Sequence, residues 1–250
     1  MKKILFIHSE KQQKYGAHYI NELTVEKLKS KGYFVDVIYP KESINLMSQD
    51  MQGISSILFY YSLIKRYKQS RKYDVVQGTT YTPLAFIGNG SKVISHFGST
   101  TWGFLKNVPS FRKLEEENKE LGAIFKNMKE NNLITTNNNF IKPLNDISKI
   151  EIYVAKKSDV VIATSKNVKR ELIRNKVPKA KIIVIHNAIE DYWFNSKVVR
   201  KVKKEANLIY IGRMGDDPFT IKLKGIDRLL FIMKNYPSLN KIIIGMCNNI

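Results

Sequence analysis

The sequence has little cysteine and no long hydrophobic run, and each of these absences excludes a class of protein. Cys247 is the single cysteine among 250 residues, which excludes a disulfide framework and makes a reducing cytoplasm the expected compartment. The apolar run 4–7 is too short for the core of a signal peptide. The run 54–64 is about half as long as a membrane-spanning helix must be. We therefore expect a cytoplasmic protein.

Acidic residues are also scarce. The chain has 42 Lys and Arg against 22 Asp and Glu, a formal net charge of +20. Such a charge favours anionic partners, namely nucleotides, phospholipid head groups or nucleic acid, although a lysine-rich genome composition would explain it equally well. The cations are dispersed, and no aromatic–basic platform or groove-reading motif accompanies them. We therefore expect no specific nucleic-acid partner.

Several catalytic motifs are missing as well. The sequence contains no Gly-x-Ser-x-Gly elbow, no Walker loop and no Gly-x-Gly-x-x-Gly. It has no Cys/His spacing typical of a metal site, and the predicted strand ends carry neither an Asp-x-Asp motif nor the paired carboxylates of a retaining glycosidase. The adjacent pair Asp216 and Asp217 falls on a predicted loop and is expected to be solvated. We expect no metal site.

What the chain does contain is a regular alternation of apolar strands and helical patterns. With 43% hydrophobic residues it has enough material for a sizeable core. The alternation predicts an α/β fold with a parallel sheet. The predicted strands are 4–7, 34–39, 73–77, 92–98, 158–163, 181–185, 207–211 and 241–244. The predicted helices are one that begins at Gly16 and ends at Gly32, and 54–72, 82–85, 111–132, 150–157, 165–172 and 225–235.

The most informative motif follows the strand 207–211. That strand ends in Gly212 and is followed by Arg213, and Lys224 stands where the next helix would start. Backbone donors at a helix N-terminus together with two fixed cations are a common way to hold a diphosphate. The alternative for Arg213 is an ordinary surface arginine after a strand.

The order of these motifs resembles that of the family-4 retaining glycosyltransferases, which have the GT-B fold. Each segment is weak alone, but together they cover nearly the whole chain in the correct order. The segments are 15–17 with the helix that follows, 31–37, 73–76, 94–98, 155–165, 181–189 with Phe194, and Gly212–Arg213 with Lys224–Gly225.

The resemblance implies two Rossmann-like domains facing each other across a cleft. We expect an acceptor-side domain at 1–188, a linker at 189–205 and the beginning of a nucleotide-sugar domain at 206–250. The family's Glu-x7-Glu segment would lie beyond Ile250, so the second domain is expected to be incomplete here. The alternative function is therefore a non-catalytic acceptor-domain fragment, or one subunit of a transferase whose second chain supplies the donor site.

The resemblance also implies roles for individual residues. Arg213 and Lys224 would stabilise the departing diphosphate next to Gly212, with no cofactor beyond the nucleotide sugar. Gly16 would let the backbone approach the diphosphate, or it is simply a loop-to-helix glycine. His96 would contact the donor sugar or the reacting centre, or it is a hydrogen-bonded loop histidine.

The remaining candidates have structural alternatives that we favour. His8 and His18 are weaker candidates for the site, Ser165 is expected to cap a helix, and Asn187 is expected in a turn. The segment 54–72 combines apolar residues with five cations. It either packs on the sheet or docks onto anionic lipid at the inner face of the membrane.

The activity implied is transfer of a sugar from a nucleoside-diphosphate donor to a cell-surface glycan or lipid-linked acceptor.

Overall fold

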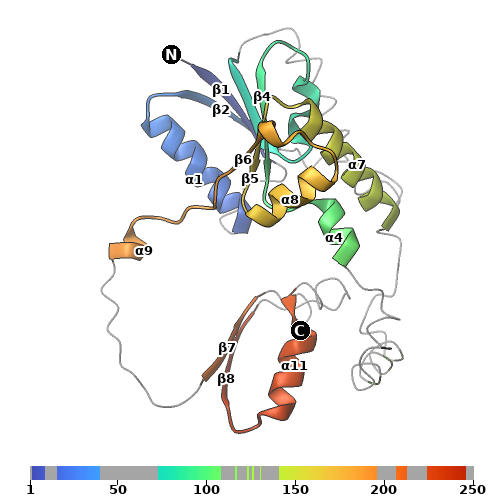
Figure 1. Cartoon of the computed structure of the whole chain (residues 1–250). Coiled ribbons are helices and arrows are strands. Elements are labelled where there is room, and N and C mark those ends of the chain that lie inside the picture. The colour runs from blue at the N-terminus through green and yellow to red at the C-terminus, as the bar shows by residue number, and fades with distance from the viewer. Residues whose placement is uncertain are drawn as a thin grey trace. The chain divides into compact units, whose positions relative to one another are not determined.

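The structure is a computed structural model, and it describes residues 2–8, 16–39, 73–107, 116, 123, 126, 130, 141–195, 207–212 and 224–245. The chain divides into two compact units (Figure 1). The first unit comprises Met1–Lys106 and Asn139–Asn195, and the second comprises Asn107–Asn138 and Ser196–Ile250. The predicted segment 54–72 lies outside the described residues, as do Arg213, Asp216 and Asp217.

The first unit contains, within its described residues, a six-stranded sheet of order β2-β1-β3-β4-β5-β6. All neighbouring strands in it are parallel. Its strands are short. They are also rich in apolar residues, because a parallel sheet is covered on both faces. In chain order its elements are β1 (Lys3–Ile7), α1 (Gly16–Ser30), β2 (Phe34–Ile38), β3 (Val75–Thr79), the 3-10 helix η2 (Thr82–Phe86), β4 (Lys92–Phe97), α4 (Thr101–Asn107), α7 (Ile141–Lys157), β5 (Val160–Ala163), α8 (Lys166–Arg174), the 3-10 helix η4 (Lys179–Lys181), β6 (Ile182–Val184) and α9 (Tyr192–Asn195).

Each face of the sheet has its own hydrophobic cluster. On one face Val25 of α1 packs with Ile4, Phe6 and Val35. On the other, Phe97 of β4 packs with residues of β5, α7 and α8. Side chains alternate between the faces along each strand. The register therefore assigns every residue at the strand ends to either the α1 face or the α7/α8 face. Figure 1 shows α1 beside β1 and β2.

The second unit contains, in its described part, the parallel pair β7 (Asn207–Ile211) and β8 (Asn240–Ile244), joined through α11 (Ile226–Asn235). Ile226 and Leu229 of α11 are buried. The isoleucines of the two strands stay exposed, including Ile211 at 74%. A β-α-β unit in this position confirms the predicted start of a second parallel sheet.

The predicted α/β fold with a parallel sheet is confirmed, and most element boundaries lie within two residues of the predicted ones. β3 begins two residues later than predicted. Just before it, the Asp74 amide donates to the Lys3 carbonyl and the Asp74 carboxylate accepts the Lys3 amide at 2.7 Å. α7 begins at Ile141 rather than at residue 150. α4 was not predicted; it starts where the Thr100 hydroxyl accepts the Gly103 amide at 2.9 Å.

Candidate active site

The strand order places a topological switch point at the carboxyl edge of the first sheet. β1 is flanked by β2 on one side and β3 on the other. The segments that follow β1 and β3 therefore leave in opposite directions and open a crevice between them, which is where ligands of open parallel sheets bind.

A row of three polar side chains crosses this edge on the α1 face. His8 directly follows Ile7, which pairs with Gly78, and the next residue of β3, Thr79, pairs with His96 of β4. Both ring nitrogens of His8 and the hydroxyl oxygen of Thr79 are buried without a hydrogen-bond partner among the described residues. An unpaired buried polar group costs about 1–3 kcal/mol. The row is therefore a place where a ligand with hydroxyl groups would supply missing partners.

His8 is held by groups from α1 and from the end of β2. Its Nε2 atom lies 3.6 Å from a carboxylate oxygen of Glu22. Its ring stacks on Tyr39 with ring centroids 4.6 Å apart, and the Tyr39 hydroxyl donates a hydrogen bond to Glu22. Burial lowers the pKa of His8 from 6.5 to about 4, with Glu22 opposing and His18 adding to this shift. His8 is therefore a neutral imidazole at physiological pH.

His96, the predicted catalytic residue, stands in the middle of the sheet. It is half-buried, and desolvation lowers its pKa below the ordinary value. Its carbonyl oxygen accepts the Thr80 amide at 2.9 Å. Thr80 has a φ of +47°, which a β-branched residue adopts only under strain. Such strain is characteristic of functional sites.

A carboxyl group that the sequence reasoning missed lies at the same edge, on the α7/α8 face. Glu151 of α7 is 4% exposed and accepts hydrogen bonds from the amide and the hydroxyl of Thr101, both at 2.9 Å. Burial raises its pKa to about 7, although hydrogen bonds from Thr101 and Thr80 act in the opposite direction.

The burial of Glu151 could have been inferred from its spacing relative to the apolar residues of the same helix. It stands four residues after the buried Ile147 and three before the buried Val154, so an apolar stripe already indicated that this position faces the core.

Three of the four predicted phosphate-binding residues belong to the second unit, and two of those three are described. The Gly212 amide donates to the carbonyl of Ile244 at 3.0 Å, at the end of β7. Lys224 is exposed and directly precedes Gly225, the N-cap residue of α11. The predicted strand and helix on the two sides of residues 213–223 are therefore present, and Lys224 stands at the N-terminal end of the helix. Arg213 lies outside the described residues.

Gly16 begins α1 with a φ of +62°, and a Cβ atom added there would meet nothing within 4 Å. The left-handed backbone alone therefore accounts for a glycine, and its predicted contact with a diphosphate stays a prediction. Ser165 is the N-cap of α8, as predicted; its hydroxyl accepts the Val168 amide at 3.1 Å. Asn187 is exposed. His18 of α1 lies close enough to His8 to influence its charge.

Within the described residues, no group of three or more His, Cys, Asp or Glu side chains is placed to hold a metal ion. None of the described helices combines the length and hydropathy of a bilayer-spanning segment.

The fold is that of the GT-B glycosyltransferases, as predicted. The whole chain superposes on sucrose-phosphate synthase from Thermosynechococcus elongatus with a TM-score of 0.62 and 14% sequence identity, covering 63% of that chain. The lipopolysaccharide outer core galactosyltransferase WaaB is similar over 98% of the chain and 68% of its own, with a TM-score of 0.53 and 12% identity.

The same fold occurs outside the transferases. The UDP-GlcNAc 2-epimerase from Neisseria meningitidis, bound to UDP-GlcNAc, is similar over 98% of the chain and 66% of its own, with a TM-score of 0.51 and 13% identity. At such identities these likenesses establish the fold alone.

The sequence comparison is more specific. Residues 126–192 match the family model of Glycosyltransferase Family 4, which confirms the predicted resemblance over that segment. It contains the whole of α7, β5, α8 and β6, and it includes Glu151. No curated protein matches the chain. The chain spans less than two thirds of the sucrose-phosphate synthase chain.

Proposed function

We propose that the chain carries the acceptor-side domain and part of the donor site of a glycosyltransferase that uses a nucleoside-diphosphate sugar. The observation that carries the proposal is the polar row at the switch point of a GT-B fold, in which the buried His8 and Thr79 lack hydrogen-bond partners among the described residues and the half-buried His96 lies beside Thr79. The match of residues 126–192 to the glycosyltransferase family supports the same class. A fold relative bound to UDP-GlcNAc supports a nucleotide sugar as ligand.

In the proposed reaction the bond between the sugar anomeric carbon and the diphosphate oxygen breaks. A bond from the anomeric carbon to an acceptor hydroxyl oxygen forms, and the hydroxyl proton passes to the departing phosphate. We propose that this occurs on one face, with retention. Negative charge grows on the diphosphate in the transition state, so fixed donors near it lower the barrier. Lys224, Arg213 and the helix N-terminus beside them would supply these donors without a metal ion.

The first unit would position the sugar and the acceptor. Neutral His96 would donate to, or accept from, a sugar hydroxyl at the reacting centre. Neutral His8 and Thr79 would hydrogen-bond further hydroxyls, and these bonds would replace the partners that the buried atoms lack. Gly16 would let the α1 backbone come close to the diphosphate. The proposed acceptor is a cell-surface glycan or a lipid-linked precursor, and the proposed compartment is the cytoplasm.

The decisive experiment measures nucleoside diphosphate released from a panel of nucleotide sugars, with and without a glycan acceptor, together with the anomeric configuration of the product. We expect release that depends on the acceptor, a retained configuration, and no loss when divalent ions are chelated. A His96→Ala variant should lose turnover, whereas a His186→Ala variant, altered at an exposed position, should not.

The other outcomes are distinct. Conversion of the donor into its epimer without an acceptor would identify an epimerase of the same fold. Turnover that appears only when a second polypeptide is added would favour the subunit alternative. Release of diphosphate that is independent of both the acceptor and His96 would contradict the proposal.

A further inference from the structure

The amino edge of the first sheet, opposite the candidate active site, is lined with lysines. Among the described residues, exposed lysines stand at the start of β1 and β4, and three to six residues before the start of β2, β5 and β6. Because the strands are parallel, their amino ends lie along one edge and bring these residues together. They are Lys2 and Lys3 at β1, Lys31 at β2, Lys92 at β4, Lys156 and Lys157 at β5, and Lys176 and Lys179 at β6. We call this set the amino-edge lysines.

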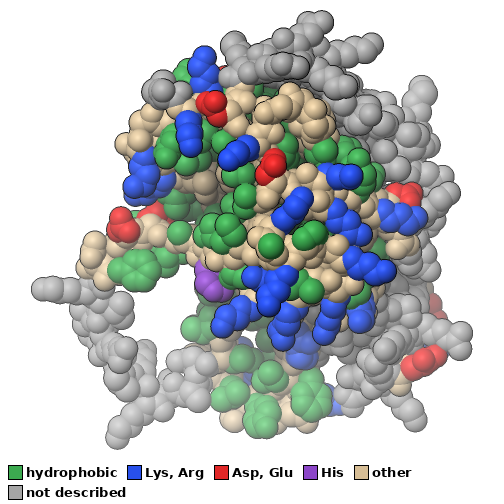
Figure 2. Space-filling view, turned by 45° about the horizontal axis from the view of Figure 1, so that its top comes forward, with side chains coloured by type: hydrophobic (Ala, Val, Ile, Leu, Met, Phe, Trp, Pro, Cys, Tyr) green, Lys and Arg blue, Asp and Glu red, His purple; other side chains and the backbone are tan. Residues whose placement is uncertain are grey.

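Few acidic groups oppose them. The acidic residues that directly precede strands are Asp74 and Asp159, and the carboxylate of each accepts a backbone amide, from Lys3 and Val93 respectively, at 2.7 Å. Lys181, beside the set, donates to the carbonyls of Lys156 and Ser158. In Figure 2 the Lys and Arg side chains spread over the whole face that it presents, and few Asp and Glu side chains lie among them.

Exposed aromatic side chains share the same edge. Tyr33 and Phe34, at the start of β2, are 39% and 42% exposed. Tyr153, near the end of α7, is 50% exposed. Aromatic rings beside lysines are typical of surfaces that lie at the interface between a membrane and water, where the ring enters the head-group region and the cation meets phosphate.

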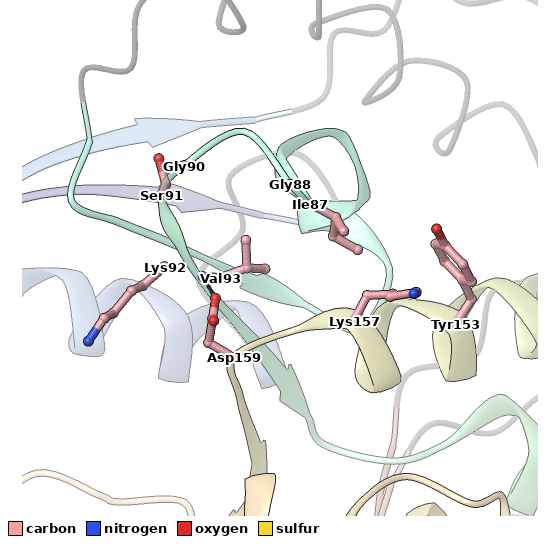
Figure 3. Close-up of a pocket in the computed structure, with 9 residues that line it drawn as sticks. All are labelled: Ile87, Gly88, Gly90, Ser91, Lys92, Val93, Tyr153, Lys157 and Asp159. Atoms are coloured by element: carbon pink, nitrogen blue, oxygen red, sulfur yellow. Dashed lines mark hydrogen bonds between the residues drawn. The ribbon is translucent and has the colours of Figure 1, made fainter.

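A depression of about 590 Å³ opens at this edge between the turn before β4 and the end of α7. Lys157 and Tyr153 line it from α7, and Lys92 and the glycines Gly88 and Gly90 line it from the other side. In Figure 3 Lys157 and Tyr153 extend from α7 together, and Lys92 extends away on the opposite side. The depression therefore has the Lys157 cation and the Tyr153 ring on one flank, while the Asp159 carboxylate that also lines it accepts the Val93 amide.

We propose that the amino edge is a docking surface for an anionic phospholipid bilayer. The lysines would pair with head-group phosphates, the aromatic rings would enter the head-group layer, and one head group would occupy the depression. The proposal uses none of the residues 54–72. The proposal is also independent of the proposed activity, because both its evidence and its test involve no nucleotide sugar.

The test is co-sedimentation of the full chain with vesicles of phosphatidylglycerol mixed into phosphatidylcholine, with pure phosphatidylcholine vesicles for comparison. The variant K156Q/K157Q/K179Q removes three amino-edge lysines. The control variant K149Q/K166Q/R170Q removes three exposed cations from α7 and α8 away from that edge, so both variants have the same net charge.

We expect the wild type to bind only the anionic vesicles. At roughly fivefold per lysine near the surface, the amino-edge variant should lose about 100-fold in partition coefficient. The control should lose much less, because its cations lie farther from the bilayer than a Debye length of about 8–10 Å. A Tyr153→Ser variant should also bind more weakly, without any change in net charge.

Three results would overturn the proposal. The first is equal loss in the two triple variants, since binding would then reflect net charge alone. The second is full binding by the amino-edge variant, which would assign docking to another segment. The third is tighter binding to random duplex DNA than to anionic vesicles in the same buffer, which would make the edge a nucleic-acid surface. Circular dichroism confirms that the variants are folded.

Discussion

At the scale of single residues, His8 makes stability depend on pH in a defined direction. Its pKa of about 4 in the folded state lies below the ordinary value of 6.5. Between these values the unfolded chain binds the proton more tightly, so this contribution is present above pH 6.5 and is lost as pH falls toward 4. After allowance for solvent screening we expect a loss of about 2 kcal/mol.

A His8→Leu variant tests this prediction. It should be at least as stable as the wild type at pH 7, because it removes two unpaired nitrogens, and it should remove much of the loss between pH 6.5 and 4. Urea unfolding across this range measures both effects. An unchanged pH dependence of the unfolding free energy in His8→Leu would refute the assignment.

Glu151 makes the free energy of unfolding change with pH in the opposite direction to His8. Its folded-state pKa of about 7 is above the ordinary value of 4.5, so the folded chain holds the proton more tightly, and stability falls as pH rises through 7. From pH 6 to 8 we expect a loss of about 1 kcal/mol. In Glu151→Gln this loss should disappear, which thermal unfolding at the two pH values will show. A slope that persists in the variant would place the titrating group elsewhere.

At the scale of elements, the N-terminus of α11 is where charge stabilisation of a diphosphate is expected. Lys224→Ala should lower kcat/KM about 100-fold, the effect of losing one preorganised donor. Lys234→Ala, in the last turn of the same helix, should have little effect. Steady-state kinetics with a responsive donor measures both, and equal losses in the two variants would show that the position of the cation does not matter.

The N-cap of α8 allows a simpler test of an element. Ser165 accepts the Val168 amide, so Ser165→Ala should cost about 1 kcal/mol of stability, and Ser165→Asp should restore most of it. Denaturant unfolding measures the difference. If the alanine and aspartate variants are equally stable, the hydroxyl does not contribute as a cap.

Some structural features could be predicted from the sequence and others could not. The strands of the first sheet could be predicted, because buried parallel strands are continuous apolar runs, and Ser165 was recognised as a cap from local spacing alone. The polar row could not be assembled from the sequence, because His8, Thr79 and His96 become neighbours only through the strand order. Glu151 required knowing which face of α7 is buried. Thr80 gave no sequence signal, since a threonine does not indicate a positive φ.

At the scale of the whole molecule, the two units should differ in stability. The first sheet has six strands with a hydrophobic cluster on each face. In the described part of the second unit, two strands leave Ile209, Ile211 and Ile244 more than half exposed. A parallel sheet depends on covering both faces. In the 250-residue chain, amides of β7 and β8 should therefore exchange with solvent much faster than those of β1, β3 and β4.

Hydrogen exchange with mass-spectrometric detection gives this comparison directly. Equal protection of the two sheets would show that the exposed isoleucines are covered in solution. Thermal unfolding should likewise deviate from a single two-state transition, because the units melt separately.

The strands of the first sheet also fix the distance between its amino and carboxyl edges. β1 and β3 have five residues each, so the two edges of the sheet are about 17 Å apart. If the amino edge rests on a bilayer, the His8–Thr79–His96 row is held at a fixed height above the lipid. A sugar attached directly to its lipid would then lie below that row, whereas the distal end of a longer glycan would reach it. The fixed distance between the two edges of the sheet would then select the substrate by its length as well as by its chemistry.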